Sequence, residues 1–232
     1  MSVVSNSTFD SLDPANPDAS AVAPPTAGGR QRLSPEERIP QILQAAAQEF
    51  ARRGFQQTRV QDIAAAAGLS KGGFYAHFSG KEAVFEALLR HNLSGSAINL
   101  QDAFSELPPM PQLIDELSAL LTQGLADEQT MLVFRILLAD GWRVPEVVDS
   151  WLENSMHSVQ AELGLLLQRC VANGSCRPSM VVEKPWLALS PVVHAMVAQL
   201  VRTGAQEFDR DQVQQDLSCL LKELLLFKEE AR

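Results

Sequence analysis

The sequence predicts an all-α protein of about nine helices, with an N-terminal three-helix module and a C-terminal helical bundle. Two observations predict this class. Helix-forming Ala, Leu, Gln and Glu dominate, whereas residues that favour strands are scattered. Apolar residues recur three and four positions apart through most of the chain, and no strand-like alternation persists. The 232 residues suffice for one large domain or two small ones.

The first 33 residues differ from the rest in composition. Ser, Asp, Asn, Pro, Ala and Gly predominate there, and large apolar residues are nearly absent. Such a segment buries too little surface to offset the entropy of ordering, so we expect a disordered tail over 1–33. Arg30 and Arg32 at its end are either phosphate contacts or a solubilising flank.

The first predicted helix begins at Ser34. Ser34 is a good N-cap, and Glu37 stands at the third helical position, where it completes a capping box. Pro40 removes one early backbone hydrogen bond, so the helix either kinks or begins only there. Gly54 ends it.

Two short helices joined by a tight turn come next. Thr58 can cap the first of them, over 59–66, and Gly68 allows a left-handed stop. Ser70 then caps a second helix that runs to about His77. This is the spacing of a helix-turn-helix, whose second helix can enter a DNA major groove about 12 Å wide.

Longer helices fill the rest of the chain. Residues 79–82 read as a further capping box that opens a long helix, and the prolines of 108–111 mark a break. Further helices are predicted at 112–124, 127–140, 145–173, 184–203 and 209–230. Gly174 follows the third of these, and Pro191 should kink the fourth.

Four spaced blocks around the helix-turn-helix carry a resemblance to a known family. They are residues 50–58 (FARRGFQQT), 60–64 (VQDIA), 67–78 (AGLSKGGFYAHF) and 81–82 (KE). Together they strongly resemble the DNA-binding domain of TetR-family regulators, over about residues 35–90. The resemblance implies a helix-turn-helix DNA-binding domain at 34–80, and a ligand-binding and dimerisation domain at 81–232. It also implies a homodimeric repressor that a ligand releases from a palindromic operator.

The same resemblance implies a DNA-contacting set. Tyr75 would meet a phosphate, and Lys81 would meet a phosphate beside the amides of its helix start. His77 would meet a phosphate or a base edge, or instead cap its own helix. The full set is Thr58, Arg59, Lys71, Gly72, Gly73, Tyr75, His77 and Lys81. The chain departs from the family at Gly73, where Thr or Ala is frequent, and at Arg59, where Ser or Thr is common.

The distribution of charge agrees with this interpretation, although the net charge of −9 does not. Residues 30–90 carry a net charge of +3, and residues 91–232 carry −9. Such an asymmetry is typical of a small DNA-contacting module attached to an acidic partner domain.

Bulky side chains in the C-terminal region are candidates for an effector pocket. They are Phe134, Trp142, Trp151, Met156, His157 and Trp186. Aromatic rings with few polar partners suit a small, mostly apolar ligand, and ordinary core packing is the alternative. Val197 and Leu221 lie on the apolar faces of the last two predicted helices. By resemblance these faces form the dimer interface, whereas periodicity alone fits an intrachain core equally well.

Other function classes find little support. The sequence contains no nucleophile elbow, HExxH, Walker loop or GxGxxG, so we expect neither an enzyme nor a cofactor. Its histidines have no ligand spacing, so we expect no metal. Three cysteines without a CxxC pair, no signal peptide and no membrane segment predict a cytoplasmic protein. An all-helical protein–protein adaptor, or a redox-responsive regulator using Cys170 and Cys176, stays open as an alternative.

Overall fold

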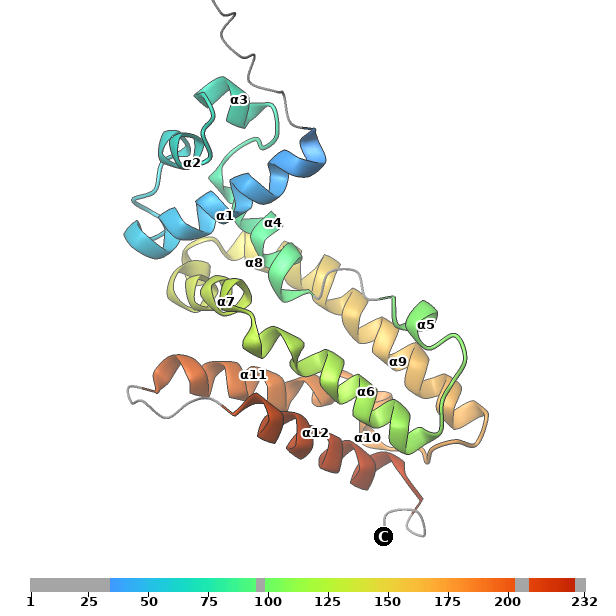
Figure 1. The fold of residues 1–232 in the computed structure, drawn as a ribbon. Coiled ribbons are helices and arrows are strands. Elements are labelled where there is room, and N and C mark those ends of the chain that lie inside the picture. The colour runs from blue at the N-terminus through green and yellow to red at the C-terminus, as the bar shows by residue number, and fades with distance from the viewer. Residues whose placement is uncertain (1–33, 95–98, 203–208, 228–232) are drawn as a thin grey trace, which may run out of the picture. The chain divides into compact units, whose positions relative to one another are not determined.

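The computed structural model describes residues 34–94, 99–202 and 209–227 (Figure 1). Within these ranges the chain is all helical and has no strand, as predicted. The α-helices are α1 (Pro35–Arg53), α2 (Val60–Ala66), α3 (Lys71–Tyr75), α4 (Lys81–Leu93), α5 (Leu100–Ala103), α6 (Met110–Thr122), α7 (Glu128–Asp140), α8 (Pro145–Trp151), α9 (His157–Ala172), α10 (Met180–Glu183), α11 (Trp186–Val201) and α12 (Arg210–Leu225). The expected tail over 1–33 lies outside the described residues.

Three differences separate these helices from the nine predicted. The short helices α5 and α10 were not predicted, because each is too short to show a helical period of apolar residues. The predicted helix at 145–173 is divided into α8 and α9 by a π-helical turn over Leu152–Met156. Two 3-10 turns, Gln123–Ala126 and Gly141–Arg143, flank α7.

The N-terminus of α1 follows the prediction. The Ser34 hydroxyl accepts a hydrogen bond from the Glu37 amide at 3.3 Å, and the Glu37 carboxylate accepts one from the Ser34 amide at 3.0 Å. Pro40 lies inside the helix, which neither begins nor ends there. Gly54 ends α1 with φ 79°, and Gly68 and Gly174 also have the positive φ expected of helix stops.

Two predicted caps are wrong. Thr58 does not cap α2, because its hydroxyl donates backwards to the carbonyls of Glu49 and Gly54. Arg59 is the N-cap residue instead, and its amide donates to the Asp62 carboxylate at 3.0 Å. At the start of α4 the N-cap residue is Gly80 and not Ser79, and Gly80 has no side chain that could accept a hydrogen bond.

One apolar cluster joins α1, α2, α3 and α4 to α7 and α8. At its centre the rings of Phe50, Phe55 and Phe85 lie 5.2 to 6.0 Å apart. Val133 and Ile136 of α7 are buried in the same cluster. The helix-turn-helix and the following helices therefore share one core, and the predicted boundary between residues 80 and 81 stays a prediction.

A second cluster fills the C-terminal bundle. It joins α6, α9 and α12 through fully buried leucines such as Leu113, Leu163 and Leu217. α12 lies along both α6 and α11 (Figure 1). None of the described helices is long and apolar enough to cross a membrane, and no group of three potential metal-ligating side chains forms among the described residues.

Candidate nucleic-acid interface

The helix-turn-helix is closed by the turn between α2 and α3. The Leu69 amide donates to the Ala64 carbonyl at 2.8 Å, across a turn in which Gly68 has φ 68°. Ala64 is buried and too small to hold the helices apart. Ser70 caps α3, as predicted, by accepting a hydrogen bond from the Gly73 amide at 3.1 Å. The turn thus sets the direction in which α3 projects.

The outer face of α3 carries a cation and an aromatic ring. Phe74 is fully buried, whereas Tyr75 is 48% exposed and Lys71 is exposed. The Tyr75 ring stands edge-on to Phe74, and the Lys71 ammonium lies 5.9 Å from the Tyr75 ring centroid. No described residue hydrogen-bonds the Tyr75 hydroxyl, so this face presents a donor and a cation to solvent.

The glycines of α3 leave its first turn open. Gly72 is exposed and Gly73 half-buried, so a bulky partner can approach the backbone closely at this end. His77 follows the helix and is half-buried. These three predicted residues lie on the same short segment as Lys71 and Tyr75.

Arg59 supplies a second cation at the start of α2. It is exposed, and within the described residues no carboxylate pairs with its side chain. By contrast, Arg52 and Arg53 are both paired with Glu49 at 2.8 and 3.0 Å. The count of basic residues in the sequence therefore overstates the positive charge that this module can offer to DNA. Arg59 and Lys71 supply a larger share of that charge than Arg52 and Arg53.

A polar hollow of about 420 Å³ lies beside Arg59. Its lining consists of Arg53, Gln57, Arg59, Gln61 and Asp62. Gln57 lies in the turn between α1 and α2, and Gln61 lies in the first turn of α2. Both were missed in the sequence, because helical spacing does not relate a turn residue to a helical one. Both are exposed amides that can hydrogen-bond phosphates or base edges.

Two predicted DNA contacts have intramolecular partners in the structure. Thr58 is only 1% exposed, and its hydroxyl is used within the turn. The Lys81 ammonium donates to the carbonyls of Phe55, Gln56 and Thr58 at 2.8, 3.2 and 3.2 Å. It also lies 4.4 Å from the centroid of the Phe55 ring. Its three N–H groups hold the turn between α1 and α2, and its contact with phosphate stays a prediction.

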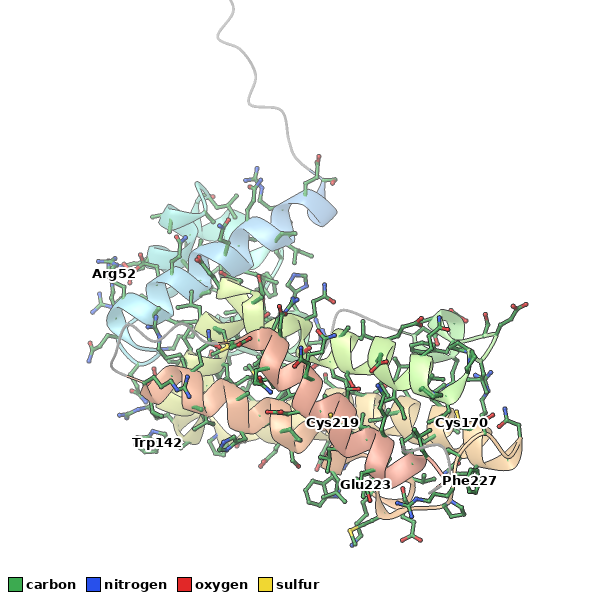
Figure 2. All side chains as sticks on the ribbon, turned by 60° about the horizontal axis from the view of Figure 1, so that its bottom comes forward. Arg52, Trp142, Cys170, Cys219, Glu223 and Phe227 are labelled. Atoms are coloured by element: carbon green, nitrogen blue, oxygen red, sulfur yellow. The ribbon has the colours of Figure 1, made fainter. Side chains whose placement is uncertain are left out.

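The six predicted pocket residues do not come together. Phe134 and Trp151 are buried in different apolar clusters, and Met156 packs against the cluster that contains Trp151. Trp142 is 69% exposed and projects from the surface (Figure 2), with the Arg143 guanidinium 4.1 Å from its ring. Trp186 and His157 are also exposed. Each of these rings has its own neighbours, and a pocket role for the six residues stays a prediction.

A different hollow lies between α7 and α11, with a volume of about 240 Å³. Its lining is Leu125, Ala126, Asp127, Glu128, Met131, Leu132, Arg135, Gln199 and Leu200. The Gln199 Oε1 atom is shielded from solvent and has no hydrogen-bond partner among the described residues. Arg135 is exposed and makes no ion pair with any described residue. Segments about 70 residues apart form this hollow, so no local sequence signal could have found it.

The cysteines do not favour a redox site. Cys170 and Cys176 are buried, and burial raises the pKa of both thiols, that of Cys176 to about 11. The reactive form of cysteine is the thiolate, which such burial disfavours. Cys219 is exposed on α12 (Figure 2).

Comparison with known proteins gives consistent matches. The family model for bacterial regulatory proteins of the tetR family matches residues 42–88. The HTH-type transcriptional regulator YfiR of Bacillus subtilis is 30% identical over 146 residues, which cover 62% of this chain and 70% of YfiR. The HTH-type transcriptional repressor KstR2 of Mycolicibacterium smegmatis is 28% identical over 150 residues, covering 64% and 72% of the two chains.

Solved structures agree in fold. The structure of Salmonella enterica GusR superposes with a TM-score of 0.61 at 24% identity, covering 83% of this chain and 97% of GusR. That of the fatty acid degradation regulator FadR from Bacillus halodurans superposes with a TM-score of 0.62 at 19% identity, covering 81% and 97%. The likeness extends beyond the helix-turn-helix into the C-terminal bundle.

Proposed function

This chain belongs to the TetR family of bacterial regulatory proteins, and we propose that it is a repressor that binds a palindromic operator as a homodimer and leaves it on binding a small, mostly apolar effector. Its relatives are transcriptional regulators, not enzymes. DNA binding is common to that family, whereas the operator symmetry, the dimer and the effector are specific parts of the proposal.

The observation that carries the proposal is the outer face of α3. Lys71 and Tyr75 stand on it with unoccupied polar groups, and Arg59 adds an unpaired cation at the start of α2. Cations and hydroxyls of this kind contact phosphates and set the register of a recognition helix in the major groove.

The exposed side of α11 supports the dimer. Trp186, Val193, Val197 and Val201 are all exposed and follow one another at intervals of seven, four and four residues, so they lie in one stripe. We call these four residues the α11 stripe. Such a row of apolar side chains is unfavourable in water, and the same row on a second copy would cover it. A two-fold dimer also suits half-sites about 34–36 Å apart.

The hollow between α7 and α11 is the proposed effector site. Its leucines and Met131 suit an apolar body. The unpartnered Gln199 Oε1 atom calls for a hydrogen-bond donor on the ligand, because a buried acceptor without a partner is costly. A mostly apolar compound with one donor group fits both features, and the six side chains predicted from the sequence stay an untested alternative.

The DNA-binding part is tested with a duplex that the unmodified chain selects from a random library. We expect Tyr75→Ala and Lys71→Ala each to weaken binding about 5- to 30-fold at a fixed salt concentration. Lys71→Ala should also lower the slope of log affinity against log salt by about 1. Lys184→Ala, an exposed cation beyond the module, is the matched control. Unchanged affinity in both α3 variants would contradict the proposed docking face.

The effector part is tested by thermal-shift screening of small apolar compounds that carry one donor. A compound that stabilises the protein through this hollow should weaken operator binding about 5- to 150-fold, because coupling between two ligands is reciprocal. Stabilisation that leaves operator affinity unchanged at saturation would remove the hollow as an inducer site.

A further inference from the structure

We propose that Asp140, the last residue of α7, is a positioning residue for operator binding. Its carboxylate ties the turn between α1 and α2 to α7, a helix that lines the proposed effector hollow, and thereby sets the position of the recognition helix α3. This inference rests on the proposed function and deepens it. It names the residue through which α7, which lines the proposed effector hollow, acts on the DNA-binding module.

The geometry of Asp140 joins distant parts of the chain. Its Oδ2 atom accepts a hydrogen bond from the Phe55 amide at 2.9 Å, across 85 residues of sequence. Its Oδ1 atom lies 3.2 Å from Arg143 Nε, and the side chain is 15% exposed. In the part of the chain that the structure describes, no other residue beyond α4 hydrogen-bonds any residue of 34–80.

The helix itself gives no reason for a carboxylate at this position. A negative charge at a helix C-terminus is opposed by the partial negative charge of the last carbonyls. The Phe55 amide, directly after the left-handed Gly54, gives the carboxylate a donor that offsets this cost. A hydrogen bond to a charged acceptor is stronger and more directional than one between neutral groups.

The turn is also held from its other side, so it moves as a unit. Lys81 binds three of its carbonyls, and the Thr58 hydroxyl closes it onto the end of α1. The turn leads directly into Arg59, the N-cap of α2, and the turn between α2 and α3 is bonded to α2 through the Leu69 amide and the Ala64 carbonyl. A displacement of Phe55 is therefore passed to the recognition helix.

Helix α7 connects this bond to the effector hollow. Glu128, Met131, Leu132 and Arg135 of α7 line the hollow, and Asp140 ends the same helix. Thirteen residues at 1.5 Å each make α7 about 20 Å long. α7 also packs against α1 through apolar side chains (Figure 1). Apolar contacts have no preferred direction, whereas the Asp140 bond selects one position of the turn.

The test compares two duplexes, one with both half-sites of the selected operator and one cut to a single half-site. Asp140→Ala should bind the two-half-site duplex about tenfold more weakly and the single half-site as well as the unmodified chain does. The DNA-contacting side chains are untouched in this variant, and only the placement of the two modules is loosened. Asp140→Asn retains an acceptor oxygen and should restore most of the affinity.

Asp149→Asn is the matched control, because Asp149 is an exposed carboxylate on α8. It should leave both affinities unchanged. Amide hydrogen exchange at Phe55 should accelerate in Asp140→Ala and not in the control. If circular dichroism shows that Asp140→Ala is unfolded, Asp140→Ser, whose hydroxyl is too short to reach Phe55, replaces it with the same expectations.

Equal loss on both duplexes would overturn the proposal, because it would mean a general defect of the module. Unchanged affinity of Asp140→Ala on the two-half-site duplex would overturn it as well, and would leave the repressor function standing. If the unmodified chain selects no duplex at all, the proposed function itself fails, and the role of Asp140 with it.

Discussion

The exposed faces of α3 and α11 differ in what they offer to a partner. α3 presents Lys71 and the polar tip of Tyr75, which are stable in water by themselves. α11 presents the α11 stripe, whose apolar side chains remain in water unless a partner covers them. The face of α3 suits a charged polymer whose affinity depends on the salt concentration, and the face of α11 suits a permanent contact with a protein. The two faces therefore suit different kinds of partner.

The largest effect is expected from substitutions in the α11 stripe. Val193→Glu combined with Val197→Glu places charges in the α11 stripe, and we expect monomers of 25.3 kDa in place of a dimer of twice that mass. Binding to a two-half-site duplex should fall at least about 100-fold, because one module alone spans one half-site. Light scattering and fluorescence anisotropy measure the two quantities.

The matched control is Leu165→Glu, which changes an exposed leucine of α9 outside the stripe and should leave the dimer intact. A dimer that persists in the double variant would show that another surface mediates assembly.

The next effect concerns the hydrogen bonds by which Lys81 holds the turn between α1 and α2. Lys81→Met retains the side-chain stem but removes the donor to three carbonyls, and should lower the free energy of unfolding by about 1.5–3 kcal/mol. Tyr75→Ala, at an exposed position, should lower it by no more than about 0.5 kcal/mol. Urea unfolding measures both. A Lys81→Met variant as stable as the unmodified chain would contradict the stabilising role of these three hydrogen bonds.

A smaller gain in stability is expected at Gly73. A Cβ atom there would lie 3.4 Å from Ser70 Oγ and 3.5 Å from Leu69 Cδ2, which are ordinary contacts. Gly73→Ala should therefore stabilise the protein by about 0.5–1 kcal/mol through better helix propensity. Gly54→Ala should do the opposite, because Gly54 has φ 79°. Thermal unfolding of the two variants separates a permissive glycine from a required one.

The smallest effect lies in the C-terminal bundle, where Asp115 of α6 accepts hydrogen bonds from Lys222 and Ser218 of α12. The Lys222 bond, then the Ser218 bond, lowers the pKa of Asp115 below its ordinary value of 3.8. Its contribution is therefore present above pH 3.8 and is lost as the pH falls through the lower value in the folded protein.

Because the Asp115 side chain is 54% exposed, Asp115→Asn should cost only a few tenths of a kcal/mol at pH 7. The difference from the unmodified chain should shrink toward pH 3 in thermal unfolding. A difference that grows in acid would contradict this linkage.

Local features of the sequence determined the helices and the module. Gly54, Gly68 and Gly174 stop helices because their conformation is a property of the residue itself. Ser34 and Ser70 cap helices because the amides that they bind lie three residues away. Lys71 and Tyr75 share a face of α3 because they are four residues apart, which is also a local property.

Only the tertiary structure decided which distant groups meet. Val197 and Leu221 stand at similar positions in the apolar pattern of their helices, yet Val197 is exposed and Leu221 is buried against α6. Helical period establishes which residues share a face, but not which face the rest of the chain covers. The hydrogen bond from Phe55 to Asp140 and the hollow between α7 and α11 could not be found in the sequence for the same reason. Both are formed by groups of segments far apart in the sequence, whose approach depends on the packing of the whole core.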